Sequence, residues 1–155
     1  MCIRDRLTRR SRSGYFIFMN MNMAPIAWLS KKQATIKTSV FGAEFVAMKI
    51  GMEALRGLPY KLRMMGAPLS GPSYIYGDNM SVIYNTQKPD STLKKKSNSI
   101  CYHAIREAVA MGECLTTHIS THKNPADIGM KFLPGGRKRD YLISLILYDL
   151  VDEHE

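Results

Sequence analysis

Three acidic residues, Glu44, Asp78 and Asp127, stand where a carboxylate could serve a chemical purpose. Asp78 follows the aromatic and β-branched run at residues 74–76, which favours a strand, and Asn79 after it is a strand breaker. We therefore expect Asp78 at the carboxyl end of a strand, where ligands and catalytic groups gather in open α/β sheets. The simpler interpretation is that Asp78 only caps the helix that follows it.

The other two carboxylates also have two interpretations each. Glu44 lies on a predicted helix beside Ala47 and Gly51, and these small neighbours would let a strand end and its carboxylate approach. The alternative is an exposed helical glutamate. Asp127 follows an Asn-Pro pair, which suits the start of a helix, and an acid in the first turn complements the helix dipole. Helix initiation alone would explain Asp127.

The elements that would position these acids alternate between strands and helices. The hydrophobic pattern predicts strands at residues 14–19, 24–30, 74–76 and 113–120. It predicts helices at residues 40–65, 79–87, 99–111 and 141–151. Pro59 is expected to kink or end the first helix early, and Leu115 and Ile119 are expected to point inward. The last helix is apolar on nearly every face, so we expect it to be buried.

The composition indicates a single domain that binds a polyanion. The chain has 155 residues and a net charge of +9, which favours nucleic acid over membrane as a partner. Its three cysteines lack metal-type spacing and indicate a reducing compartment. No apolar run approaches the roughly 20 residues of a membrane span. We expect a soluble intracellular protein, cytoplasmic or nuclear, that is not secreted.

Six short motifs follow one another along the chain: Arg9-Arg-Ser-Arg-Ser-Gly-Tyr15, Ile26-Ala-Trp-Leu-Ser-Lys-Lys-Gln33, Ala43-Glu-Phe-Val-Ala47, Tyr76-Gly-Asp-Asn79, Tyr102-His-Ala-Ile-Arg-Glu107 and Ala126-Asp-Ile-Gly-Met-Lys131. In this order they resemble the ribonuclease H domain of copia-type retrotransposon polyproteins. The resemblance implies an α/β fold, a ribonuclease H-like mixed β-sheet flanked by helices. It also implies an endonuclease that hydrolyses the RNA strand of an RNA/DNA hybrid.

The resemblance assigns roles to individual residues. Glu44, Asp78 and Asp127 would be catalytic metal ligands for Mg²⁺, with Mn²⁺ as an alternative, and metal-activated water would attack the phosphodiester. The hybrid would be recognised through its shape and its 2′-hydroxyls. The residues expected to contact it are Asn79, Lys31, Lys32, Lys94, Lys95 and Lys96, although a lysine run is often only a solvated surface. The implied partners are this hybrid and the reverse transcriptase domain of the same polyprotein, with no membrane.

The departures from the family pattern concern the amino-terminal end. The family's first catalytic Asp lies on a strand upstream of the Arg9 motif, where this chain has only residues 1–8, and Asp5 is too close to Arg9 to replace it. We therefore expect the first central strand, between the hairpin and the Asp78 strand, to be missing. The expected division is a non-family or truncated terminus at 1–8, a ribonuclease H-like domain at 9–134, and a basic linker with an apolar helix at 135–155.

A missing carboxylate leaves an alternative function open. The alternative is a catalytically dead, nucleic-acid-binding remnant of such a domain, which keeps the basic surface without the metal chemistry. A fourth carboxylate on a strand before Arg9 distinguishes the two hypotheses, and we expect little or no hydrolysis by residues 1–155 alone. Gly42 is a lesser departure. It stands where the family usually has Glu, and it costs the helix about 1 kcal/mol in propensity.

Overall fold

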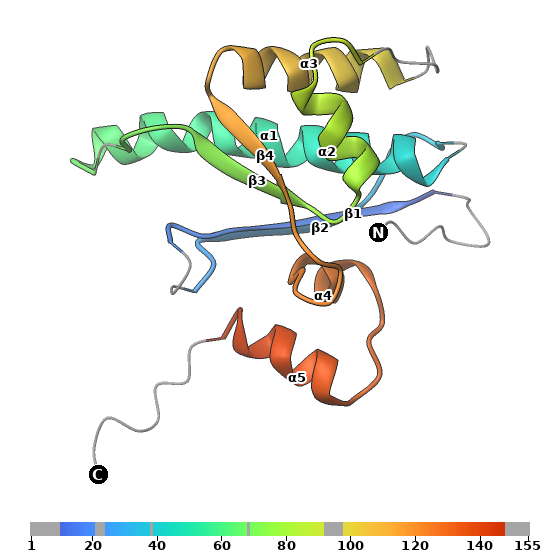
Figure 1. Cartoon of the computed structure of the whole chain (residues 1–155). Helices are drawn as coiled ribbons and strands as arrows, with labels where there is room; N and C mark the ends of the chain where they lie inside the picture. Colours follow the sequence, from blue (N-terminus) through green and yellow to red (C-terminus); the bar gives the residue numbers. More distant parts are fainter. Residues whose placement is uncertain (1–9, 21–23, 38, 68, 92–97, 148–155) are drawn as a thin grey trace.

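Two small β-sheets and the helices around them make up the part of the chain that the structure describes (Figure 1). The computed structural model describes residues 10–20, 24–37, 39–67, 69–91 and 98–147. These residues form a mixed α/β arrangement in which a β-hairpin comes first and a parallel strand pair follows. In this part of the chain no helix is long and apolar enough to cross a membrane.

The hairpin pairs β1 (Arg12–Ile17) with β2 (Ala27–Lys32) in antiparallel orientation. The sequence predicted the hairpin, but the strand bounds differ: β1 begins two residues earlier than expected, and β2 continues to Lys32. Buried Gln33 explains the extension, because its side-chain amide donates to Ser13 Oγ at 2.7 Å and to the Ala43 carbonyl at 2.8 Å. These bonds fix the open end of the hairpin to the first helix.

The long helix α1 (Val40–Met64) begins at Ser39, whose hydroxyl accepts the Gly42 amide at 3.2 Å. Its apolar face was predicted correctly: Phe45 and Met52 are buried in the core, and Met48 and Leu55 pack against that core. The expected early end at Pro59 is wrong. A proline inside a helix removes one backbone bond, yet here the helix runs past Pro59 to Met64, and the Met65 amide closes its final turn.

The second sheet is the parallel pair β3 (Ser73–Gly77) and β4 (Cys114–His118), covered by α1, α2 (Met80–Gln87) and α3 (Ser99–Ala110). The inward face of β4 was predicted wrongly, since Leu115 is 38% exposed while Cys114 and Thr116 are buried. The buried Thr116 hydroxyl has a partner in Thr86, 2.8 Å away on α2. This hydrogen bond compensates for burying the Thr116 hydroxyl. It holds Thr116, instead of Leu115, on the buried face of β4.

The two short helices α4 (Ala126–Met130) and α5 (Arg137–Ser144) lie on the side of the hairpin opposite α1 (Figure 1). α4 approaches closely because of Gly14: a Cβ there would lie 2.9 Å from Met130 Cγ. The last helix differs from its prediction, since it begins inside the expected basic linker. Of its apolar residues Leu142 is buried, but Tyr141 is 45% exposed. Residues 148–151 of the expected helix lie outside the described part.

The described residues confirm the expected mixed α/β class and form two separate sheets, while the single mixed sheet, from which the first central strand was expected to be missing, stays a prediction. β1 pairs with β2 along one edge, and β3 pairs with β4 along one edge. No strand among the described residues joins β1 to β3. Residues 1–8, where we expected a non-family or truncated terminus, also lie outside the described part of the chain.

Candidate active site

Asp78 follows directly on the last residue of β3, as predicted. The simpler interpretation, that Asp78 caps the next helix, is wrong, because Asn79 has that role. The Asn79 side-chain oxygen accepts the Ser81 amide at 3.0 Å and the Val82 amide at 3.4 Å. Capping leaves Asp78 at the strand end and fixes the orientation of Asn79 beside it. The predicted contact of Asn79 with a nucleic-acid groove stays a prediction.

Glu44 faces this strand end from α1. Burial raises the pKa of the Glu44 carboxyl, and the negative charge of Asp78 acts in the same direction. A hydrogen bond with Asn79 and the positive charge of Lys131 oppose the rise in pKa. α1 and β3 can approach here because β3 ends in a glycine: a Cβ on Gly77 would lie 3.1 Å from Met48 Cε. The helix and strand thus bring two carboxylates and a carboxamide together.

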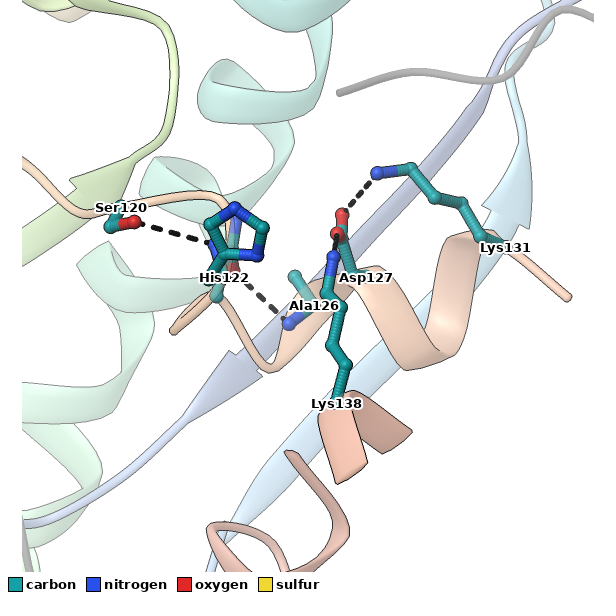
Figure 2. A network of polar contacts seen from close by, with 7 residues as sticks. Ser120, His122, Ala126, Asp127, Lys131 and Lys138 are labelled. Atoms are coloured by element: carbon teal, nitrogen blue, oxygen red, sulfur yellow. Dashed lines mark hydrogen bonds and ion pairs between the residues drawn. The ribbon is translucent and has the colours of Figure 1, made fainter. Parts of the chain in front are cut away.

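Asp127 lies in the first turn of α4, where the sequence placed it. The Asn124 side-chain oxygen accepts the Ala126 amide at 3.1 Å, at the first residue of the helix, whose N-cap is Pro125. Asp127 is fully buried, and each of its oxygens contacts an ammonium group. Lys131 Nζ lies 2.7 Å from Oδ1, and Lys138 Nζ lies 3.2 Å from Oδ2. Figure 2 shows the two lysines reaching Asp127 from different segments.

These contacts decide how well the residues fit a hard divalent cation. Glu44, Asp78 and Asn79 offer the oxygen atoms that Mg²⁺ prefers, and the Lys131 ammonium, which pairs with Asp127, also acts electrostatically on Glu44. In the described part of the chain, however, no three His, Cys, Asp or Glu side chains are close enough together to hold a metal ion. Asp127 meets two lysines instead. The donor set fits in part, and the role of all three acids as ligands stays a prediction.

A cavity of about 630 Å³ lies beside β1 and β3 and is lined by Glu44 and Asp78, but not by Asp127. Successive residues of β1 and of β3 line it, so each strand presents an edge to the cavity rather than a single face. Ala47 and Gly51 of α1 also line it, which agrees with the expectation that these small residues leave room beside Glu44. Asp78 and Asn79 stand at the same cavity.

The basic residues expected to bind phosphates are described only in part. Lys31 and Lys32 end β2 with exposed side chains, while Lys94, Lys95 and Lys96 lie outside the described residues. Sequence reasoning missed both lysines that contact Asp127. The four-residue spacing of Asp127 and Lys131 on one helix was a signal that could have revealed the first. No sequence signal pointed to Lys138.

Comparisons with known proteins give one consistent result. The chain is 32% identical over 117 residues to each of two Arabidopsis thaliana proteins, the retrovirus-related Pol polyproteins from transposons RE2 and RE1. It is 30% identical over 127 residues to the retrovirus-related Pol polyprotein from transposon TNT 1-94 of Nicotiana tabacum. The matches cover 76% to 81% of this chain but only 8% to 9% of each relative. No family model and no solved structure matches the chain.

Proposed function

We propose that this chain, a homologue of a short region of transposon Pol polyproteins, is a ribonuclease H-type endonuclease domain of a copia-type element. Its reaction would be hydrolysis of the RNA strand of RNA/DNA hybrids. One observation carries the proposal: Glu44 on α1 and Asp78 at the end of β3 come together, with Asn79 and the cavity beside them. Paired carboxylates at a strand end are suited to binding the cations that such hydrolysis uses.

The domain would be completed by a strand in the cavity. β1 and β3 both present edges to it, and an edge strand exposes backbone groups that another strand can pair with. β1 has six residues and β3 has five, so a segment of similar length would pair with both. Upstream polyprotein sequence is the proposed source of this strand and of the fourth carboxylate. The result would be the expected mixed sheet flanked by helices.

The chain's own residues would hold the cation and orient its surroundings. Glu44 and Asp78 would be its ligands, and the helix cap would hold the Asn79 carboxamide in place. Asp127 would become a third ligand once one of its carboxylate oxygens no longer pairs with Lys131 or Lys138. Burial and the charge of Asp78 disfavour ionised Glu44, so a bound cation would favour the ionised form. Bound Mg²⁺ or Mn²⁺ would activate water and stabilise charge on the phosphate.

The hybrid would bind through charge and shape. The net charge of +9 favours a polyanion, and an A-like duplex exposes 2′-hydroxyls across a wide minor groove. Lys31 and Lys32, together with the run of three lysines at 94–96, are the proposed phosphate contacts. The reverse transcriptase domain of the same polyprotein would supply the hybrid.

Cleavage of an end-labelled hybrid tests the proposal. The protein is the chain extended upstream into its own polyprotein, assayed with Mg²⁺. Asp78→Asn should lower the rate by about 100-fold or more, because even indirect partners of metal ligands contribute about 10- to 100-fold. The matched control is Asp90→Asn, which removes an exposed carboxylate and should leave the rate unchanged. Unchanged cleavage by Asp78→Asn would refute the proposed role of Asp78.

The second candidate is the nucleic-acid-binding remnant without catalysis. It is favoured by the lack of a three-acid cluster among the described residues. It predicts salt-sensitive binding of the hybrid without Mg²⁺-dependent cleavage, even by the extended chain. The same assay therefore separates the two candidates.

A further inference from the structure

The buried Asp127 carboxylate holds two ammonium groups in fixed positions. Its side chain is fully buried, and each of its oxygens contacts one lysine, Lys131 at 2.7 Å and Lys138 at 3.2 Å. A buried carboxylate needs a partner, and one ammonium group balances its charge. Lys131 provides that partner from the same short segment, since its side chain is only 12% exposed. The cluster as a whole therefore keeps the positive charge of the second lysine.

Lys138 is the lysine of this pair that a partner from solution can reach. It comes from α5, and its side chain is 37% exposed. A Cβ added at Gly135 or Gly136, just before this helix, would meet nothing within 4 Å in the described structure, so the surface beside the loop is open. An ammonium group carries more than one N–H donor. Lys138 can therefore keep its contact with Asp127 and still donate to a second anion.

Further cations surround Lys138. Arg137 and Arg139 flank it in the first turn of α5, and both are exposed. Asp140 is the acidic residue of that turn, so three cations stand beside one exposed carboxylate. A run of basic residues is often only a solvated surface. This run differs because a buried carboxylate fixes its middle member.

The hairpin brings one more cation to α4. Arg12 of β1 donates to the Ser30 hydroxyl at 3.1 Å, and that hydroxyl donates to the Gly129 carbonyl of α4. Cations from α5 and from the hairpin thus both adjoin α4. Such a concentration of positive charge favours a polyanion with repeated charges.

We propose that residues 137–139 form a surface that binds backbone phosphate of nucleic acid, with Lys138 as the fixed contact and Asp127 as the residue that positions it. Immobilising a lysine side chain costs rotamer entropy, and the contact with Asp127 has already fixed this one. Phosphate contacts set the orientation of a nucleic acid without reading its sequence. The choice of nucleic acid as the partner rests on the function proposed above. This role uses Asp127 paired with both lysines, and it competes with the proposed role of Asp127 as a third ligand.

The salt dependence of hybrid binding tests the phosphate contact. A fluorescently labelled RNA/DNA hybrid is titrated with the whole chain at several NaCl concentrations, in EDTA. Lys138→Met should lower the slope of log K against log salt by about 0.9, since each phosphate contact contributes about that much. Lys138→Arg keeps the charge and should keep the slope of the unmodified chain.

The matched control is Lys61→Met, which removes an exposed lysine from the last turn of α1. α1 lies on the side of the hairpin opposite α4 and α5 (Figure 1), so this variant should leave the slope unchanged. Equal slopes for Lys138→Met and Lys61→Met would overturn the inference. Absence of hybrid binding by the unmodified chain would overturn it as well.

Asp127→Asn separates positioning from overall charge. It raises the net charge by one, so general attraction predicts a slope at least as steep as that of the unmodified chain. Positioning predicts that the slope falls as in Lys138→Met, because Lys138 loses its fixed partner. A slope that does not fall would overturn the positioning role of Asp127. The Lys138 variants change a partly exposed side chain, so they test the contact even if Asp127→Asn does not fold.

Binding in EDTA is measured without cleavage, which keeps this inference distinct from the proposed function. Slopes that fall as expected in a chain that cleaves nothing would refute only the catalytic role. Unchanged slopes in a chain that cleaves the hybrid would overturn only the phosphate contact at Lys138.

Discussion

At the scale of single residues, the environment of Glu44 makes the stability of the protein depend on pH. Burial, followed by the charge of Asp78, raises the pKa of the folded-state carboxyl above the ordinary value of 4.5. Folded Glu44 therefore keeps its proton at a pH where the unfolded chain has lost it. The free energy of unfolding should fall as the pH rises through this interval, and the loss should be complete above the folded-state pKa.

Glu44→Gln removes this titration without a large change in shape. The variant should gain stability relative to the unmodified chain as the pH rises from about 4 to about 7. Urea denaturation across that range, without divalent cations, measures the difference between the two proteins. A difference that stays constant with pH would show that Glu44 titrates as it does in the unfolded chain.

The candidate site could be predicted residue by residue only where a local pattern specified it. Strand-breaking residues placed Asp78 correctly at the end of β3, and the Asn-Pro pair placed Asp127 at the start of α4. The contact between Asp127 and Lys138 joins α4 to α5. Gly135 and Gly136 lie in the loop between these helices, so no helical periodicity relates the two residues. The pairing of Thr86 with Thr116 is also a tertiary contact, and it decided the face of β4 against the hydrophobic pattern.

At the scale of elements, Gly42 allows α1 and the start of α3 to pack closely. A Cβ there would lie 2.7 Å from Asn98 Oδ1, and Asn98 is buried at the start of α3. The absence of a side chain lets α1 and α3 approach at this point. What the sequence presented as a loss of helix propensity is therefore also a packing requirement.

Two glycines of α1 provide a matched comparison. A Cβ added at Gly57 would meet nothing within 4 Å, so Gly57→Ala should stabilise the protein by about 0.5–1 kcal/mol through helix propensity. Gly42→Ala gains the same propensity but must push against Asn98, and should be less stable than Gly57→Ala by about 1–3 kcal/mol. Chemical denaturation measures both variants. Combining Gly42→Ala with Asn98→Ala should remove most of the deficit, and equal stability of the two single variants would contradict the packing explanation.

The helices were easier to predict than their surroundings. α1 and α3 match the expected ranges to within a residue at each end, because their apolar positions recur at helical spacing. α5 was misplaced because its apolar residues suggested full burial, whereas in the described part it packs on α4 through one side and leaves Tyr141 exposed. Hydrophobic pattern alone does not specify whether a partner surface is present.

At the scale of the whole molecule, the described residues form two two-stranded sheets beside a cavity. Protein interiors are close-packed, and backbone groups along strand edges need partners. A cavity of about 630 Å³ lined by β1 and β3 is far larger than a water molecule, and under the proposed function one more strand would pair with both edges there. The resemblance predicted that a strand between the hairpin and the Asp78 strand is missing, and the link between that strand and this cavity stays a prediction. The sequence of the strand that would fill it cannot be derived from residues 10–147.

The most direct test compares two proteins on one end-labelled RNA/DNA hybrid with Mg²⁺: residues 1–155 alone, and the same chain extended upstream into its polyprotein. The extension would supply the strand for the cavity and the fourth carboxylate beside Asp78. We predict that the extended chain cleaves the RNA strand and that residues 1–155 show little or no cleavage. Robust Mg²⁺-dependent cleavage by residues 1–155 alone, lost on Asp78→Asn, would contradict the need for a fourth carboxylate, and no cleavage by either protein would favour the binding remnant.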